Sequence, residues 1–565
     1  MFLILISWIY ILFTTVNLGY AFDKIICLKN NNFIINSILG LFSVTILASI
    51  WAIFGRINIE FHLFLLLLNI LVLLKFRNPI LKIYKSFTVE LYQLSLFLKI
   101  FLILIIFLII AQCASIPFVI DNESYYIQTI KWINEYGFVK GLVNLHLFFG
   151  QTSGWHIAQS VFNFSFLYPN FNDLSGFCLL LGNIFSIQKL NKFYKNNNLN
   201  YLLLSLLPLF NLFFFQFISA PSPDIPVYIF SFILFFYFLE NFKKTDSETF
   251  SLIVILVLFL LYIKNTTLTL AIFPIILLGL HFKLLSRTLL KPVLLTCLVV
   301  VLFIIKNMII CGSPIFPSKI FNDLTNYAIP NTIQTFYYDQ VKYYGFFITA
   351  DEYNAMSVFD LFSKWISMPK LNGLFNKIGV LLIITVPFFI YKFQNKKAFW
   401  VLYFIMILQL FLLFVTSPQY RFFMNFILFF LLFCFFSVIQ NKKIINLILL
   451  LSLIPTFVVL FLPVNLNRFS NHKFMLEISN FSVKNIVFPY QNTKSNTPFE
   501  TIELGNLKYN SPVKNDFFWA NGNGNLPCVD KRQIDYFEKY FRIIPQMRTT
   551  DLKDGFYAKQ LSENE

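Results

Sequence analysis

Long apolar runs separated by short polar loops are the feature that most constrains how this chain folds. A helix needs about 20 apolar residues to cross roughly 30 Å of hydrocarbon. With 58% hydrophobic and only 13% charged residues, the chain lacks the polar surface that a water-soluble protein requires. We therefore predict an all-α transmembrane bundle of about fourteen spans. The spans are Phe2–Phe22, Phe33–Phe54, Ile59–Leu74, Leu96–Ile120, Leu174–Ile187, Tyr201–Ser219, Val227–Leu239, Phe250–Ile263, Leu268–Leu280, Pro292–Ile310, Ile378–Tyr391, Ala398–Val415, Phe422–Val438 and Ile444–Leu462.

Basic residues gather in the loops between these runs and predict one orientation. Lys and Arg mark cytoplasmic loops, and with the spans above every cluster falls on the same side of the membrane. Both termini then lie outside the cytoplasm. The clusters are Lys24 and Lys29; Lys75, Arg77, Lys82 and Lys85; Lys189, Lys192 and Lys195; Lys243 and Lys244; Lys283, Arg287 and Lys291; Lys392, Lys396 and Lys397; Lys442 and Lys443.

The formal net charge of +17 comes from these dispersed clusters. Nucleic-acid binding needs basic residues gathered on one face, so we expect no nucleic-acid partner. The chain also lacks the GxxxxGK[ST] loop and the strand–GxGxxG–helix unit that bind nucleotide phosphates. ATP-driven transport by this chain alone is therefore disfavoured.

The predicted orientation divides the chain into four parts. Residues 1–120 form N-terminal transmembrane helices, and residues 121–173 form a first external loop with interfacial helices and candidate catalytic acids. Residues 174–462 form the transmembrane core, which includes a second external loop at 311–377. Residues 463–565 shift to a soluble composition with turn signals such as Asn521-Gly522-Asn523-Gly524. They predict a small α+β domain outside the cytoplasm.

Two acids open the first external loop and are the leading candidates for chemistry. Asp121 and Glu123 lie two residues apart at the edge of the membrane, where carboxylates suit a general base or the ligands of a divalent metal. The spacing in residues 126–133 predicts an amphipathic helix along the interface, and the acids could equally cap it. His146 and His156 follow on the same loop and are candidates for substrate binding.

Four further charged residues are predicted near the outer ends of spans, namely Asp224, Lys264, Lys306 and Arg421. Ionisable residues at membrane depth are costly and mark functional sites by default. For Lys264 and Arg421 the alternative is that the side chain merely reaches the headgroup region. Taken together, the acids and cations predict one external site for a lipid-linked phosphate, in which cations bind the phosphate and a carboxylate acts as base.

These motifs resemble those of the polytopic bacterial glycosyltransferases of the C fold (GT-C). More narrowly, they resemble a family of uncharacterised multi-pass membrane proteins with the same layout. The resemblance runs from about Asp121 to near the C-terminus. It rests on Asp121–His146 with Gly154-Trp155, on Ser219–Pro226, on Lys306-Asn307 with Gly312–Pro317, on Ser417-Pro418 with Arg421-Phe422, on Leu526-Pro527-Cys528 and on Lys553–Phe556.

The resemblance implies a glycosyltransferase that takes a sugar from a polyprenyl-phosphate donor at the outer face of the bacterial inner (plasma) membrane. Asp121 would be the catalytic base, with Glu123 as its neighbour or as a metal ligand. No cofactor is implied beyond a divalent metal at these two acids. The partners would be the donor, the lipid bilayer and an acceptor that is a glycan, a lipid or a protein. Lys306 stands where the resemblance leads us to expect arginine.

Two other classes of function fit the same sequence. A polyprenyl-linked glycan polymerase, ligase or flippase would share the lipid partner and the outer cations, but a flippase needs no catalytic acid. A non-enzymatic envelope protein would use the bundle as an anchor and residues 463–565 to bind a partner. We take the glycosyltransferase as the primary hypothesis.

Overall fold

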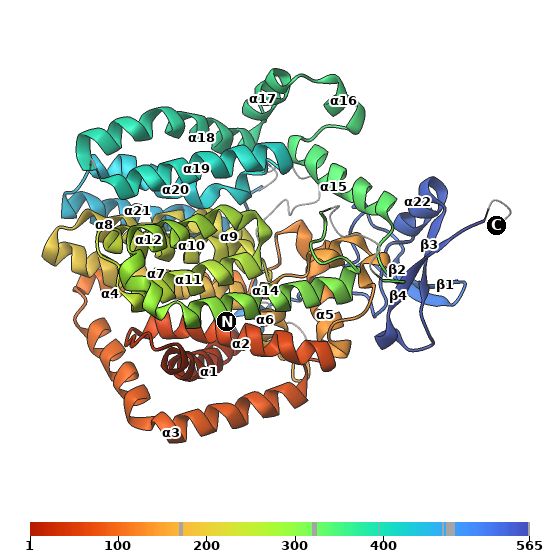
Figure 1. Ribbon diagram of the computed structural model, residues 1–565, viewed down its shortest axis with the longest axis horizontal. Coiled ribbons are helices and arrows are strands. Elements are labelled where there is room, and N and C mark those ends of the chain that lie inside the picture. The colour runs from red at the N-terminus through yellow and green to blue at the C-terminus, as the bar shows by residue number, and fades with distance from the viewer. Residues whose placement is uncertain (169–172, 319–324, 395, 466–467, 470–480, 563–565) are drawn as a thin grey trace.

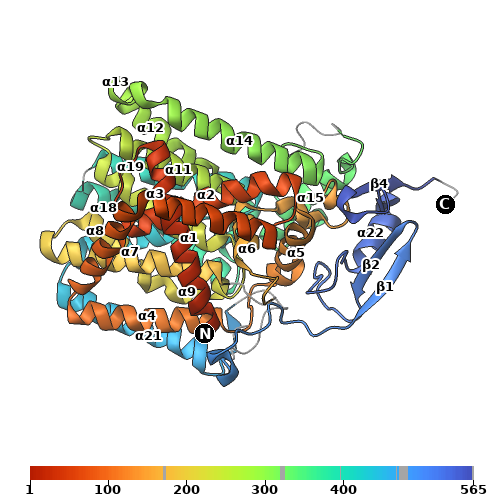
Figure 2. The same ribbon diagram turned by 90° about the horizontal axis from the view of Figure 1, so that it is seen from below.

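The computed structural model describes residues 1–168, 173–318, 325–394, 396–465, 468–469 and 481–562. The remaining positions include 169–172 and 319–324 of the two predicted external loops and 470–480 of the predicted C-terminal domain. These parts of the predicted regions lie outside the described residues. The described chain is a bundle of helices with a small domain of strands at one end, as Figures 1 and 2 show from two directions.

The bundle is built from helices of both predicted transmembrane regions. The N-terminal helices are α1 (Phe2–Ile26), α2 (Phe33–Phe54), α3 (Ile59–Tyr92) and α4 (Leu96–Cys113). The core contains α7 (Leu174–Asn196), α8 (Leu199–Ser205), η4 (Leu207–Phe210), α9 (Asn211–Ile218), α10 (Asp224–Asn241), α11 (Ser247–Ile263), η5 (Asn265–Ala271), α12 (Ile272–Leu280), α13 (Phe282–Leu285), η6 (Ser286–Thr288), α14 (Leu290–Cys311), α18 (Lys370–Phe389), η7 (Ile390–Gln394), α19 (Lys397–Thr416), η8 (Tyr420–Phe422), α20 (Met424–Val438) and α21 (Lys442–Phe461).

Fewer spans are present than the sequence predicts. Among the described residues, ten helices are long and apolar enough to cross a membrane, or eleven if a bent pair counts as one span. Each of the fourteen or so predicted runs overlaps helical structure. However, α11 and α20 have only 17 and 15 residues, and the pair η5–α12 and α13–η6 is bent by 92°. In α7, polar residues such as Asn183 and Lys189 interrupt the apolar run.

Two predicted boundaries differ from the structure for local reasons. The span predicted at Leu96–Ile120 ends at Cys113, because Pro117 disfavours helical backbone in the residue before it. The span predicted at Ile59–Leu74 continues as α3 to Tyr92, with a break at Phe76. Pro79, three residues beyond the break, removes one backbone hydrogen bond from the helix.

The basic clusters from distant parts of the sequence lie close together. Lys29 pairs with Glu248 at 2.8 Å, and the Lys291 ammonium donates to the Ile25 carbonyl at 2.7 Å. The Lys442 ammonium likewise donates to the Tyr194 carbonyl at 2.5 Å. These contacts join the C-terminal ends of α1 and α7 to the N-terminal ends of α11, α14 and α21. The loops at these helix ends therefore meet in two groups, as one shared side of a membrane requires of them.

The regions predicted to be external contain short helices and a small mixed domain. The first loop contains the π-helical turn η1 (Asn122–Tyr126), α5 (Ile127–Tyr136), η2 (Leu142–Asn144), η3 (Leu147–Gln151) and α6 (Gly154–Phe162), and the second contains α15 (Asn331–Phe346), α16 (Ala350–Ala355) and α17 (Val358–Ile366). The C-terminal region contains η10 (Val483–Ile486), β1 (Phe499–Leu504), β2 (Leu507–Pro512), α22 (Lys531–Phe541), β3 (Ile543–Met547), η11 (Leu552–Asp554) and β4 (Phe556–Gln560). Two antiparallel hairpins, β1–β2 and β3–β4, give the small sheet region that the sequence predicts.

The C-terminal region is docked on the first loop rather than held apart from it. The Gln128 amide donates to the Gly522 and Gly524 carbonyls at 3.1 and 2.9 Å, and Phe556 N donates to the Lys140 carbonyl at 2.9 Å. As a result α5, which was expected to lie along the membrane interface, is largely buried. Gln128 and Asn134 of its polar face are covered by protein.

Helices α1 and α2 pack closely because each has a glycine at the contact. A Cβ atom on Gly40 would lie 1.8 Å from the Thr15 carbonyl oxygen, and one on Gly19 would lie 1.8 Å from that of Asn36. The Thr15 hydroxyl also bonds to the Ser37 hydroxyl at 2.8 Å. Small residues of this kind let helix backbones approach within a membrane.

The Gly40→Ala substitution should separate α1 from α2. We expect a loss of about 1–3 kcal/mol, because the added methyl group meets backbone that cannot move aside. Thermal unfolding of the detergent-solubilised protein measures the effect. Gly279→Ala in α12 is the matched control, since a Cβ there meets nothing within 4 Å. Equal midpoints for the two variants would contradict the close packing.

Candidate functional site

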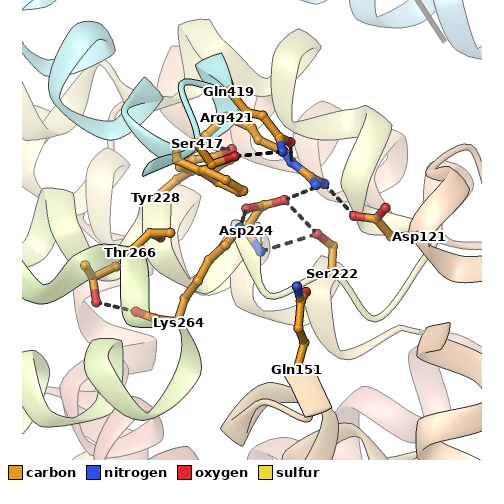
Figure 3. A network of polar contacts seen from close by, with 12 residues as sticks. Asp121, Gln151, Ser222, Asp224, Tyr228, Lys264, Thr266, Ser417, Gln419 and Arg421 are labelled. Atoms are coloured by element: carbon orange, nitrogen blue, oxygen red, sulfur yellow. Dashed lines mark hydrogen bonds and ion pairs between the residues drawn. The ribbon is translucent and has the colours of Figure 1, made fainter. Parts of the chain in front are cut away.

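Two acids and two cations form one network at the end of the bundle that adjoins the C-terminal domain. Arg421 Nη1 lies 2.5 Å from Asp121 Oδ2 and 3.8 Å from Asp224 Oδ2. The Lys264 ammonium pairs with Asp224 Oδ1. Figure 3 shows Asp224 between the two cations and Asp121 on the far side of the guanidinium. We call Asp121, Asp224, Lys264 and Arg421 the charged quartet.

Each member of the charged quartet lies where a helix begins or ends. Asp224 is the first residue of α10, where the helix dipole favours an acid. Lys264 caps the C-terminus of α11, where the dipole favours a cation. Arg421 lies in η8, between α19 and α20, and Asp121 precedes the π-helical turn η1. Four separate chain segments therefore meet through their charges.

Polar neighbours hold the charged quartet in place. Arg421 Nε donates to Gln419 Oε1 at 3.0 Å, and the Tyr228 hydroxyl donates to the Arg421 carbonyl at 2.9 Å. Asp224, whose side chain is only 1% exposed, also receives the Ser222 hydroxyl at 3.5 Å. The Phe422 ring lies 4.3 Å from the Lys264 ammonium, which adds a cation–π contact. The charges are thus fixed in position rather than free in solvent.

A cavity of about 440 Å³ lies beside the charged quartet. Asp121, Lys264 and Arg421 line it, and Lys306 on α14 contributes a third cation to its wall. The rest of the wall is mixed. Its apolar part includes Leu268 of η5, Phe303 of α14 and Leu412 of α19, and its polar part includes Gln151, Thr152, Ser153 and Gln409. The cavity can therefore hold a ligand with both an ionic and an apolar part.

Glu123 does not share the cavity with Asp121. Its carboxylate accepts hydrogen bonds from the Thr493 hydroxyl at 2.6 Å and from Lys494 N at 2.9 Å. Its carbonyl accepts from Asn521 N and Gly522 N, each at 2.9 Å. Burial raises the pKa of this carboxyl group, against the hydrogen bonds that favour its charged form. Glu123 thus joins the first loop to the C-terminal region.

The two acids do not form a divalent-metal site. Asp121 Oδ2 is bound by Arg421, whereas the Glu123 oxygens accept from Thr493, Lys494 and Asn122. A metal at Glu123 would have to displace those donors. Within the described ranges, no group of three or more His, Cys, Asp or Glu side chains is placed to hold a metal ion.

The two histidines lie near the site but outside the wall of the cavity. His146 contacts the C-terminal region, with Nε2 3.3 Å from the Trp519 carbonyl and Nδ1 accepting from Phe148 N at 3.2 Å. His156 accepts from Ser153 N at 3.3 Å and packs on Tyr126, with ring centroids 4.8 Å apart. Burial lowers the pKa of both imidazoles to about 3. Their predicted role in substrate binding stays a prediction.

Several uncharged residues at the site were not predicted from the sequence. Gln409 of α19 bonds to the Thr266 carbonyl at 2.6 Å and so holds the η5 loop beside Lys264. Gln151 accepts from the Tyr125 hydroxyl at 3.2 Å and lines the cavity. Gln409 is a buried amide in an otherwise apolar span, and this signal could have found it. Nothing in the local sequence distinguishes Gln151.

Comparison with protein families adds one finding. The family model described as "Domain of unknown function (DUF8201)" matches residues 1–428. The chain belongs to this family. The matched part contains the charged quartet and Lys306, whereas the C-terminal sheet region lies beyond it. No match was found among curated proteins or among solved structures.

The pairing within the charged quartet predicts a non-additive effect of substitution. Lys264→Met leaves Asp224 buried and paired only at the longer distance to Arg421, and we expect a loss of about 3 kcal/mol. Adding Asp224→Asn to the same chain should recover much of that loss, because no buried charge is then left unpaired. Thermal unfolding in detergent measures both variants. Additive losses would show that the two side chains do not interact.

The buried histidines predict acid lability. The unfolded chain binds protons at histidine near pH 6.5, whereas folded His146 and His156 stay neutral down to about pH 3. Stability therefore falls as pH drops below about 6.5, by about 2 kcal/mol per histidine at pH 5. His146→Gln should flatten the fall in unfolding midpoint between pH 7 and pH 5, and the more exposed His281→Gln should not. An unchanged slope in His146→Gln would contradict the neutral state.

Proposed function

We propose that this protein is a membrane glycosyltransferase that takes a sugar from a polyprenyl-phosphate donor on the extracytoplasmic face of the membrane. The observation that carries the proposal is the presence of a carboxylate and three cations in the wall of one cavity with an apolar part. A lipid-linked phosphate needs both an anion-binding wall and an apolar wall. The helix bundle around the cavity is apolar enough to lie in a bilayer, where such a donor resides.

In the proposed reaction, Asp121 acts as the general base. The acceptor hydroxyl attacks the anomeric carbon as its proton passes to the Asp121 carboxylate. The bond between the anomeric carbon and the phosphate oxygen breaks, and its electron pair stays on the phosphate. A single displacement of this kind inverts the anomeric configuration. A base in hydrogen-bond reach contributes about 10²–10⁴-fold to the rate.

Arg421 and Lys264 support the proposed step from opposite sides of Asp224. The guanidinium stabilises the charged form of Asp121 before the acceptor binds. As negative charge grows on the leaving phosphate, Asp121 takes up the proton of the acceptor, so Arg421 is no longer neutralised by Asp121 and can, together with Lys306, stabilise that charge from the cavity wall. Because Asp224 fixes both Arg421 and Lys264, it acts in this scheme as a positioning residue and does not touch the reacting atoms.

The Asp121→Asn substitution tests the proposal. We expect release of polyprenyl phosphate from labelled polyprenyl-phosphate sugars to fall about 10²–10⁴-fold, because the amide cannot accept the proton. The assay uses the full chain in membranes that contain the native acceptors. Asp23→Asn is the matched control. Asp23 is a buried aspartate near the C-terminal end of α1, and it does not line the cavity.

Three outcomes would contradict the proposal. Normal product formation by Asp121→Asn would remove Asp121 from the role of base. Movement of labelled polyprenyl lipid across reconstituted vesicles without sugar transfer would favour a flippase, which needs no catalytic acid. An unchanged glycan profile in cells that carry Asp121→Asn, with a changed one in cells that lack residues 463–565, would favour a non-enzymatic envelope protein.

A further inference from the structure

Lys306 differs from the other two cations of the cavity. Its side chain is buried, at 3% exposure, and its ammonium donates to the Thr152 carbonyl and lies 5.1 Å from the Phe303 ring centroid. In the part of the chain that the structure describes, no carboxylate forms an ion pair with it. A buried ammonium group without a counter-charge is costly. A bound anion would remove that cost.

The charges around the cavity are nearly balanced. Within the charged quartet, the two carboxylates neutralise Lys264 and Arg421. Lys306 then leaves one positive charge in excess among the described side chains at the site. In a poorly solvated cavity, a charged group without an opposite charge beside it is destabilised, because it has lost its hydration and gained no partner. The ligand favoured is therefore the one whose charge balances that of the cavity wall. The cavity is therefore matched to a ligand that carries one negative charge.

The shape of the wall indicates what else the ligand contains. Leu268, Phe303 and Leu412 line the cavity, and Leu268 is 64% exposed on the surface of the bundle. The lining therefore continues from Lys306 to a face that would contact lipid. An amphipathic lipid can place its anionic group at Lys306 and its chain along these side chains.

We propose that Lys306 is the counter-ion for a lipid phosphodiester, a head group with a single negative charge, and that the cavity selects it over a lipid diphosphate. The inference rests on the proposed function and gives the reason that its donor would join the sugar to the lipid through one phosphate rather than two. A diphosphate brings at least one further negative charge. To pair with that charge, Lys264 would have to leave Asp224, or Arg421 would have to leave Asp121. Because Asp224 is buried, separating it from its partner would cost a large amount of free energy.

Binding can be measured without any transfer reaction. The full chain in detergent is titrated with four compounds: a polyprenyl methyl phosphodiester, a polyprenyl diphosphate, phosphatidylglycerol and inorganic phosphate. The shift of the thermal unfolding midpoint reports the affinity for each. We expect the prenyl phosphodiester to bind at least about tenfold more tightly than the diphosphate and than inorganic phosphate.

Substitutions separate the role of Lys306 from a general effect on folding. Lys306→Gln should weaken binding of the phosphodiester about tenfold or more, and Lys306→Arg should retain it. The matched control is Lys189→Gln, since Lys189 is 8% exposed and also lies on aromatic rings but does not line the cavity. Asp224→Asn adds one positive charge to the site and should shift the preference toward the diphosphate. If Lys306 had only a structural role, the Asp224→Asn substitution would not change the ratio of the affinities for the phosphodiester and the diphosphate.

Each outcome bears on the inference in a defined way. Equal binding of phosphatidylglycerol would retain the phosphodiester and assign it to bilayer phospholipid rather than to a prenyl donor. Tighter binding of the diphosphate by the unsubstituted protein, binding of inorganic phosphate as tight as that of the lipids, or unchanged phosphodiester binding in Lys306→Gln would overturn it. If Asp121→Asn keeps full transfer while Lys306→Gln loses binding, the proposed base fails and the phosphodiester site stands.

Discussion

A charge inside an apolar helix bundle has no water to stabilise it, and this constraint organises the candidate site. Asp224 is almost fully buried, and it is tolerated because Lys264 and Arg421 lie on its two sides. Arg421 in turn holds Asp121. One set of ion pairs therefore positions four helix ends that are far apart in the sequence. The shape of the cavity beside them depends on these ion pairs.

The sequence predicts the bundle well because apolar runs of a given length have few other stable folds. It does not predict bends and short helices, which depend on packing. The bent pair η5–α12 and α13–η6 is an example: it turns at His281, where the ring Nε2 lies 3.0 Å from the carbonyl oxygen of Phe242, a residue distant in the sequence. The sequence also placed Asp121, Asp224, Lys264 and Arg421 at one end of the bundle. Which acid pairs with which cation is a property of the folded chain alone.

Glu123 shows why proximity in sequence misleads. Asp121 and Glu123 are two residues apart, and on a helical turn such residues point in different directions. The structure has helical backbone at this place, so Asp121 faces Arg421 whereas Glu123 faces Thr493 and Lys494. The two carboxylates that are close in sequence therefore have different partners: Asp121 pairs with Arg421 at the cavity, and Glu123 binds the C-terminal region.

The docking of the C-terminal region on the first loop has a consequence for biosynthesis. Residues 492–494 and 521–524 supply partners for residues 122–131, so the loop that carries Asp121 must wait for almost the whole chain to leave the ribosome. Until then, Glu123 lacks its final hydrogen bonds. A premature stop after α21, the last helix of the bundle, would leave the helix bundle complete but the loop that carries Asp121 without those partners.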